Sequence, residues 1–249
     1  MEETGKNPIQ VAERLFQVIE RLAENGPMGI MDLSAELGFH KSTTHRLVTS
    51  LQYMGYIRQD EESLKYALSL KFLEIGSKIL EQTNMASLIH PSLKKLSEQT
   101  GETVHLVRRE GTEAVYIDKV ESTVSSIRMV SRVGSRIPLY CSGVGKALLA
   151  ELPDPEIEDI WNSSEITSLT PYTVTSLSDL MDRIRGVREA GYAMDDEENE
   201  EGVRCIAVSI PDYHKEPVYA LSISAPVSRM TDARIAELST DVLTFKKDL

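Results

Sequence analysis

Cysteine is nearly absent from this sequence of 249 residues, which holds only Cys141 and Cys205. Two distant cysteines exclude a disulfide framework and fit a reducing cytoplasm. The chain also lacks an apolar run of about 18 residues, which excludes a transmembrane helix. Its first ten residues are polar and lack the apolar core of a signal peptide. We therefore expect a cytoplasmic protein with no membrane partner.

Metal and cofactor motifs are missing as well. The sequence has no CxxC, HxxxH or HExxH spacing, so it indicates no metal site. The segment YCSGVGKALLA at 140–150 has two glycines at the start of a predicted helix. Their spacing fits neither a Walker P-loop nor a dinucleotide-binding motif. We expect no cofactor. Internal repeats and low-complexity linkers are also absent, and the length suits one large or two ordinary domains.

Positive charge is scarce: 27 Lys and Arg stand against 39 Asp and Glu, which gives a net charge of −12. Such a balance is unusual for a protein that binds nucleic acid. However, the segment from Lys41 to Arg58 holds three basic residues and no acidic one. A locally basic element on an acidic chain is typical of binding that depends on specific contacts and dimer geometry.

Residues 29–57 contain the most informative pattern. Apolar periodicity predicts helices over 11–24, 31–37 and 41–54, with Gly38 placed for a left-handed turn between the last two. Short strands at 56–59 and 65–68 flank a polar turn and predict a hairpin. Three helices and a hairpin in this order indicate a winged helix-turn-helix, although three short helices alone would fit any α domain.

The third helix has two distinct faces. Its inward face is predicted to hold Thr44, Leu47, Val48, Leu51 and Met54. Its outward face, which includes Tyr53, carries polar and basic side chains that suit base and phosphate contacts in double-stranded operator DNA. The candidate DNA-binding residues are Lys41, Ser42, Thr43, His45, Arg46, Thr49 and Arg58.

The remainder of the chain alternates strands and helices. We predict a connecting helix from residue 70 to 83, strands at 103–109, 114–120, 126–130, 203–210 and 218–225, and helices at 86–100, 143–150, 154–161, 177–190 and 232–247. Strands paired in hairpins with helices between them indicate an α+β domain around a mostly antiparallel sheet. The expected division is a DNA-binding domain (1–69), a linker helix (70–85) and a second domain (86–249).

Three features of the second domain favour a small-molecule pocket. Gly143 and Gly145 at a helix start could bind an anion through backbone amides, or could simply allow tight packing. Ser222 and Ser224 share one face of an apolar strand, which is either a polar pocket or a solvent face. Most acidic residues of the segment 194–205 are predicted to lie in a solvated loop, and Asp195 is set apart as the candidate to accept hydrogen bonds from ligand hydroxyls.

Two other functions stay open at this point. An enzyme would use Cys141 or a serine as nucleophile, with His90, His105 or His214 as base. A metal or redox sensor would use Cys141 together with Cys205.

DLSAELGFHKSTTHRLVTSLQYMGYI, PLYCSGVGKALLA, GYAMDDEENEEGVRCIAVSI and YALSISAP together resemble the IclR family of bacterial transcription regulators. The resemblance covers nearly the whole chain. It implies a winged helix, a linker helix and a GAF- or profilin-like domain that binds a small organic acid, in a homodimeric or tetrameric protein that is usually a repressor. It places the effector on Gly143, Val144, Asp195, Cys205, Ser222 and Ser224. The stretch 103–142, from TVHLVRREGTEAVYIDKVES to SRVGSRIPLYCS, most resembles the KdgR type of regulators of pectin and sugar-acid breakdown, which implies 2-keto-3-deoxygluconate as effector.

Overall fold

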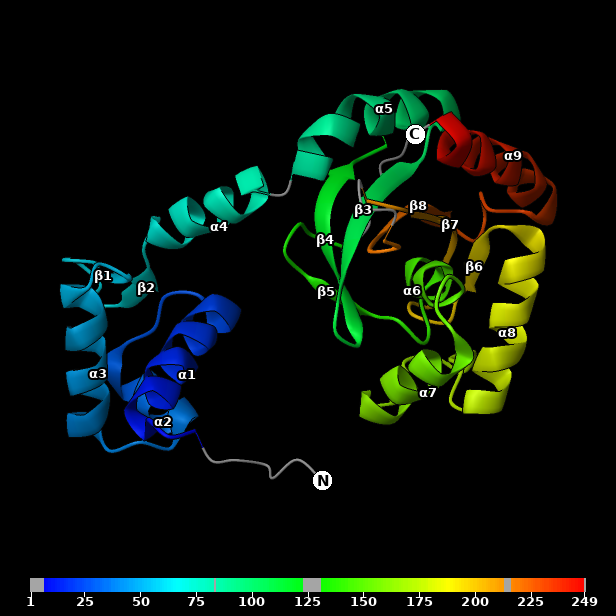
Figure 1. The fold of residues 1–249 in the computed structure, drawn as a ribbon. Helices are drawn as coiled ribbons and strands as arrows, with labels where there is room; N and C mark the ends of the chain where they lie inside the picture. Colours follow the sequence, from blue (N-terminus) through cyan, green and yellow to red (C-terminus); the bar gives the residue numbers. More distant parts are fainter. Residues whose placement is uncertain (1–6, 83, 123–130, 213–215, 249) are drawn as a thin grey trace. The chain divides into compact units, whose positions relative to one another are not determined.

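The computed structural model describes residues 7–82, 84–122, 131–212 and 216–248. Its internal contacts divide the chain into an N-terminal unit, Met1–Gln82, and a C-terminal unit, Thr83–Leu249 (Figure 1). Each unit has its own buried core. None of the helices in the described ranges combines the length and apolarity that a membrane crossing needs.

The N-terminal unit is a winged helix-turn-helix followed by one further helix. Its elements are α1 (Gln10–Asn25), α2 (Ile30–Leu37), α3 (Lys41–Tyr53), β1 (Ile57–Gln59), β2 (Tyr66–Leu68) and α4 (Lys71–Gln82). The strands β1 and β2 pair antiparallel and form the predicted wing. Gly38 ends α2 with a φ of 65°, a left-handed conformation that glycine adopts without strain.

The predicted faces of α3 are confirmed with one exception. Thr44, Leu47, Val48 and Leu51 are buried against α1, α2 and the wing. Met54, however, is 39% exposed, so its predicted inward position was wrong. It follows the last helical residue and forms the C-terminal cap, and it therefore no longer follows the helical periodicity.

The linker helix α4 is held to the winged helix at its first turn. Nζ of Lys71 donates a hydrogen bond of 2.7 Å to the carbonyl of Met54 and lies 4.3 Å from the centre of the Tyr56 ring. The ring of Phe72 packs against the same tyrosine. Farther along, Leu73 and Ile75 are 69% and 39% exposed. The helix therefore presents apolar side chains that its own unit does not cover.

A six-stranded antiparallel sheet, in the order β5-β4-β3-β8-β7-β6, forms the centre of the C-terminal unit. In chain order the elements are α5 (Asn84–Thr100), β3 (Thr103–Glu110), β4 (Glu113–Val120), β5 (Arg136–Pro138), α6 (Gly143–Leu149), α7 (Asp154–Ser163), α8 (Leu177–Ala190), β6 (Ala193–Asp196), β7 (Val203–Ile210), β8 (Tyr219–Pro226) and α9 (Asp232–Asp248). The predicted α+β class and the predicted hairpins are thus confirmed. The short strands β5 and β6 were missed, and the strand predicted at 126–130 lies outside the described residues.

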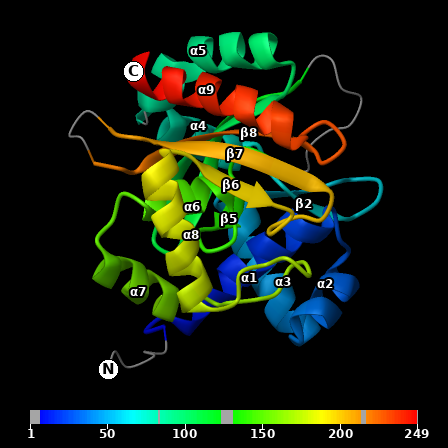
Figure 2. The ribbon, with the colours of Figure 1, turned by 90° about the vertical axis from the view of Figure 1, so that its right-hand side faces the viewer.

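Helices cover both faces of this sheet. Figure 2 shows α5 and α9 on one face and α6, with α8 beside it, on the other. Alternation along the strands divides the core accordingly, since Leu106, Ile206 and Leu221 pack toward α5 and α9. Val107 and Ala207 pack toward α6 and α8. Polar residues that share the α6 face of the strands are therefore enclosed within the domain.

Candidate functional sites

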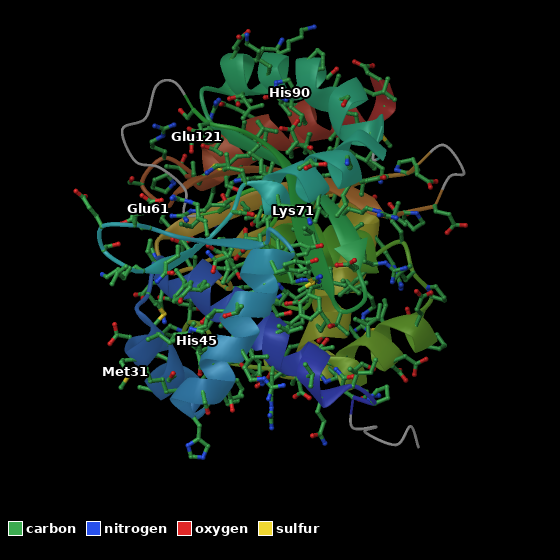
Figure 3. The ribbon with its side chains drawn as sticks, turned by 90° about the vertical axis from the view of Figure 1, so that its left-hand side faces the viewer. Met31, His45, Glu61, Lys71, His90 and Glu121 are labelled. Atoms are coloured by element: carbon green, nitrogen blue, oxygen red, sulfur yellow. The ribbon has the colours of Figure 1, made fainter. Side chains whose placement is uncertain are left out.

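One face of α3 in the N-terminal unit is exposed, polar and basic. Lys41, Ser42, His45, Arg46 and Thr49 are all exposed there, and Thr43 is half-buried. Arg58 is exposed on β1 of the wing. Figure 3 shows His45 on α3 and Glu61 at the tip of the wing. Helix and wing therefore present the seven predicted DNA-binding residues with their side chains accessible or partly accessible.

Within the described part of the chain, no carboxylate forms a salt bridge with the cations on this surface, although the charge of Arg58 acts on nearby Asp60. Among the described residues, no ion pair or hydrogen bond is formed by the side chains of Lys41, Arg46 or Arg58. Arg21, on α1, instead pairs with Glu24 at 2.9 Å. Unpaired guanidinium and ammonium groups beside an exposed helix face suit contacts with phosphates and guanine edges.

In the C-terminal unit, strand register brings the predicted effector residues together. Asp195 on β6 is directly opposite Cys205 on β7, which is opposite Ser224 on β8. Ser222 occupies the next row, opposite Ala207. Because directly paired residues point to the same face of a sheet, these four polar side chains share the α6 face. Both serines and Asp195 are at most 5% exposed, which excludes the alternative that the serines lie on a solvent face.

The first turn of α6 lies against this polar row. A Cβ atom on Gly143 would be 3.4 Å from the backbone N of Asp195 and 3.5 Å from Cβ of Ala207. Ser142 caps the helix by accepting a hydrogen bond of 3.1 Å from the amide of Gly145. Among the described residues, the amides of Gly143 and Val144 have no acceptor outside the helix. All six predicted effector residues therefore surround one region of the sheet.

The acidic segment after β6 is only partly solvated: Asp195, which the prediction set apart from the rest of 194–205, is buried, and the prediction of a solvated side chain was wrong at Glu198. Oδ1 of Asp195 accepts hydrogen bonds from the amides of Glu198 and Asn199, at 2.8 and 3.3 Å. The Glu198 side chain is 1% exposed and pairs with Nζ of Lys146 on α6 at 2.5 Å. Sequence alone gave no signal for this pair, because its members are 52 residues apart.

Burial changes the ionisation of this site. It raises the pKa of Asp195 to about 7, against the lowering effect of Lys146 and the two backbone amides. Burial also raises the pKa of the Tyr116 phenol, which stays protonated at neutral pH. The Tyr116 phenol is thus a neutral hydrogen-bonding group, whereas Asp195 changes its charge near neutral pH.

Exchanging Asp195 for asparagine tests this shift through stability. The folded pKa of about 7 lies above the ordinary value of 3.8, so the unfolded chain releases this proton first as the pH rises. The free energy of unfolding contributed by Asp195 is then full below about pH 4 and is lost by about pH 7. We expect the stability of the wild type, relative to Asp195→Asn, to fall across that window in urea titrations. Parallel curves for the two proteins would contradict the shift.

From the sequence, His105 was a candidate only for the general base of an enzyme. The structure places it on β3, directly opposite Ser222, and 2% exposed. Its Nδ1 lies 3.5 and 3.4 Å from the hydroxyls of Ser222 and Ser224. Period-two spacing puts His105 on the same strand face as Thr103 and Val107, but only the register between β3 and β8 places it against the two serines.

The two alternative chemistries find little support. Burial raises the pKa of Cys141 to about 12 and also raises that of Cys205, so both thiols stay protonated at neutral pH. Protonated thiols are poor nucleophiles and metal ligands. His105 is near two serines, but burial and the charge of Lys119 lower its pKa to about 3, which is too low for a general base at neutral pH. His214 lies outside the described residues.

Both units match models of known protein families. Residues 11–61 match the IclR helix-turn-helix domain, and residues 77–249 match the C-terminal domain of the bacterial transcriptional regulator IclR. The chain belongs to the IclR family of bacterial transcriptional regulators. This IclR-family protein is therefore a DNA-binding transcription regulator, and its α+β fold with an N-terminal winged helix is that of the family.

Individual relatives match nearly the full length of this IclR-family chain. The acetate operon repressor of Salmonella typhimurium is 36% identical over 97% of this chain and 89% of its own length. The regulator KdgR of Escherichia coli is 37% identical over 93% and 89%. The crystal structure of Thermotoga maritima IclR superposes with a TM-score of 0.79 at 33% identity and covers 95% of both chains. The resemblance to the KdgR type is consistent with these matches.

Proposed function

We propose that this protein is a repressor whose C-terminal unit binds a small organic acid that changes its affinity for operator DNA. The observation that carries the proposal is the enclosed polar row of Asp195, Cys205 and Ser224, with Ser222 beside it. Burying so many polar groups is unfavourable unless they have hydrogen-bond partners. Inside the chain, two backbone amides donate to Asp195, and Nδ1 of His105 lies within 3.5 Å of both serine hydroxyls. A carboxyl group and two hydroxyls can form more hydrogen bonds than these, and a polar ligand would use that remaining capacity. Relatives such as the acetate operon repressor are repressors by name.

The chemistry of the row suits a hydroxylated monocarboxylate. Serine hydroxyls and the Asp195 carboxyl exchange hydrogen bonds with ligand hydroxyls. The amides of Gly143 and Val144 would accommodate the carboxylate. A 2-keto acid with a hydroxylated tail, such as 2-keto-3-deoxygluconate, satisfies both ends, in line with the similarity to KdgR.

We assign residues 1–69 to DNA binding, 70–85 to the linker helix and 86–249 to effector binding in the cytoplasm. The exposed apolar side chains of α4, Leu73 and Ile75, support a homodimer or tetramer. A single helix of 12 residues is marginal in water unless it packs against a partner. Sedimentation of the full chain with and without effector measures this assembly.

Replacing Arg46 with alanine tests the DNA-binding surface. We expect operator affinity to fall about 5- to 150-fold, because a guanidinium that contacts a guanine edge contributes about 1–3 kcal/mol. The measurement is a titration of fluorescent operator DNA at fixed salt. Arg185→Ala is the matched control, since Arg185 is exposed on α8 and the variant changes net charge equally. Equal affinities of the two variants would contradict this role of Arg46.

The same titration tests effector control. We expect 2-keto-3-deoxygluconate to shift operator affinity by about 5- to 150-fold, the usual range of coupling between two sites. It should also raise the unfolding temperature, because a ligand that binds only the folded state stabilises it. Operator binding that never responds to sugar acids or short keto acids would refute the effector part of the proposal and leave the DNA-binding part intact.

A further inference from the structure

His105 connects three serines inside the proposed effector site. Its Nε2 lies 2.8 Å from the hydroxyl of Ser131, and its Nδ1 lies 3.4–3.5 Å from those of Ser224 and Ser222. Nζ of Lys119 donates a hydrogen bond of 2.8 Å to the carbonyl of Ser131. The ring of Tyr116 packs edge-on against the imidazole, with 5.2 Å between ring centres. The imidazole is thus held in place from both ends and from one side.

The imidazole is neutral in this environment. Burial, reinforced by the positive charge of Lys119, lowers the pKa of His105 to about 3. A neutral imidazole has one N–H donor and one lone-pair acceptor, on opposite nitrogens. The direction of the hydrogen bond with Ser131 therefore determines whether Nδ1 accepts from or donates to Ser222 and Ser224.

Each tautomer has a consequence for the ligand. Where Nδ1 accepts a serine proton, that serine presents only lone pairs to a ligand, which must then donate. Where Nδ1 donates, the serine proton is free to point at the ligand, which must then accept. A ligand hydroxyl can satisfy either arrangement, whereas a keto or carboxylate oxygen can satisfy only the second.

We infer that His105 is a positioning residue of the effector site, which orients the hydroxyls of Ser222 and Ser224 and thereby favours an effector with a hydroxylated tail over a bare keto acid. The inference rests on the proposed effector function. His105 on β3 would then contribute to ligand selectivity, alongside the six predicted effector-binding residues, which lie on α6, β6, β7 and β8. None of the effector-binding residues predicted from sequence lies on β3.

The experiment compares two ligands and two matched variants. 2-Keto-3-deoxygluconate and pyruvate share the 2-keto acid head and differ in the hydroxylated tail. His105→Phe keeps an aromatic ring but removes both nitrogens. His90→Phe is the same exchange on the exposed side of α5, where His90 pairs with Asp118. Calorimetric titration of the full chain gives the affinity for each ligand.

We expect His105→Phe to weaken binding of 2-keto-3-deoxygluconate about five- to tenfold, as expected for loss of one neutral hydrogen bond. Its effect on pyruvate should be less than about twofold, and His90→Phe should change neither. Equal loss for both ligands, or no loss for either, would overturn the inference while the proposed function stands. If the wild type binds neither ligand, the inference fails, and the effector part of the proposed function fails with it only when no other sugar acid or short keto acid shifts operator affinity.

A second readout uses the wild type and does not depend on the folding of a variant. In protein with ¹⁵N-labelled histidine, the two ring nitrogens of a neutral imidazole have distinct shifts that identify the tautomer. We expect saturation with 2-keto-3-deoxygluconate to shift both nitrogens of His105 and to leave those of His90 unchanged. Unchanged His105 nitrogens at saturation would contradict a positioning role.

Discussion

Replacing Gly145 with alanine is expected to destabilise the C-terminal unit by about 3 kcal/mol or more, near the upper end of what single substitutions do. A Cβ atom at this position would lie 2.2 Å from the carbonyl oxygen of Leu139 and 2.3 Å from its Cα. Both are backbone atoms, so no change of rotamer relieves the clash. Either α6 or the segment before it must move, and α6 is buried along its whole length.

Urea unfolding of the full chain measures this effect. The single tryptophan, Trp161, lies on α7 and packs against Tyr140 at 6.0 Å between ring centres. Its fluorescence therefore reports the C-terminal unit. Gly186→Ala on α8 is the control, because a Cβ atom there has no neighbour within 4 Å. In a helix interior that exchange should stabilise by about 0.5–1 kcal/mol. If Gly145→Ala lowered the free energy of unfolding by less than about 1 kcal/mol, this would contradict the close approach of residue 145 to the backbone of Leu139.

Gly145 shows which structural roles can be predicted from the sequence and which cannot. The motif 140–150 predicted a glycine-dependent helix start but left anion binding and tight packing as equal alternatives. In the structure the two glycines differ, since Gly145 meets the backbone of Leu139 and Gly143 borders the polar row. Which residue faces which neighbour depends on chain segments outside the motif, and local spacing carries no information about them.

Because local spacing carries no information about distant segments, the predictions for the rest of the chain succeeded for some elements and failed for others. Helices and long hairpins follow from periodicity within about ten residues, and these predictions were confirmed. The strands β5 and β6 have three and four residues and contain Arg136 and Asp195, so no alternation could be recognised. Ser222 and Ser224 were found from period-two spacing alone, whereas their neighbour His105 required the register between β3 and β8.

Removing the positive charge of Lys146 is expected to have the other large effect on stability. Lys146 and Glu198 are 2% and 1% exposed, and Oε2 of Glu198 has no hydrogen-bond partner among the described residues. In Lys146→Met the carboxylate remains buried, with only the distant guanidinium of Arg183 at 3.8 Å. Breaking a buried ion pair from one side costs about 3–5 kcal/mol. Trp161 fluorescence in urea measures the loss.

The double variant Lys146→Met, Glu198→Leu separates this cost from packing. It removes both charges and keeps similar volumes, so we expect most of the lost stability to return. The backbone turn at residue 198 is retained, because the hydroxyls of Thr170 and Thr173 donate to its carbonyl. Lys94→Met is the matched control, since Lys94 and Glu98 are exposed on α5 and their pair contributes at most about 1 kcal/mol.

The variant Lys146→Met, with and without Asp195→Asn, connects stability to the proposed effector site. Lys146 is one of the groups that lower the pKa of Asp195, so its loss should raise that pKa further. We therefore expect the pH window in which Asp195 costs stability to extend upward in Lys146→Met, relative to the same variant carrying Asp195→Asn. An unchanged window would mean that Lys146 acts on Glu198 alone and that the ion pair supports the fold without influencing Asp195.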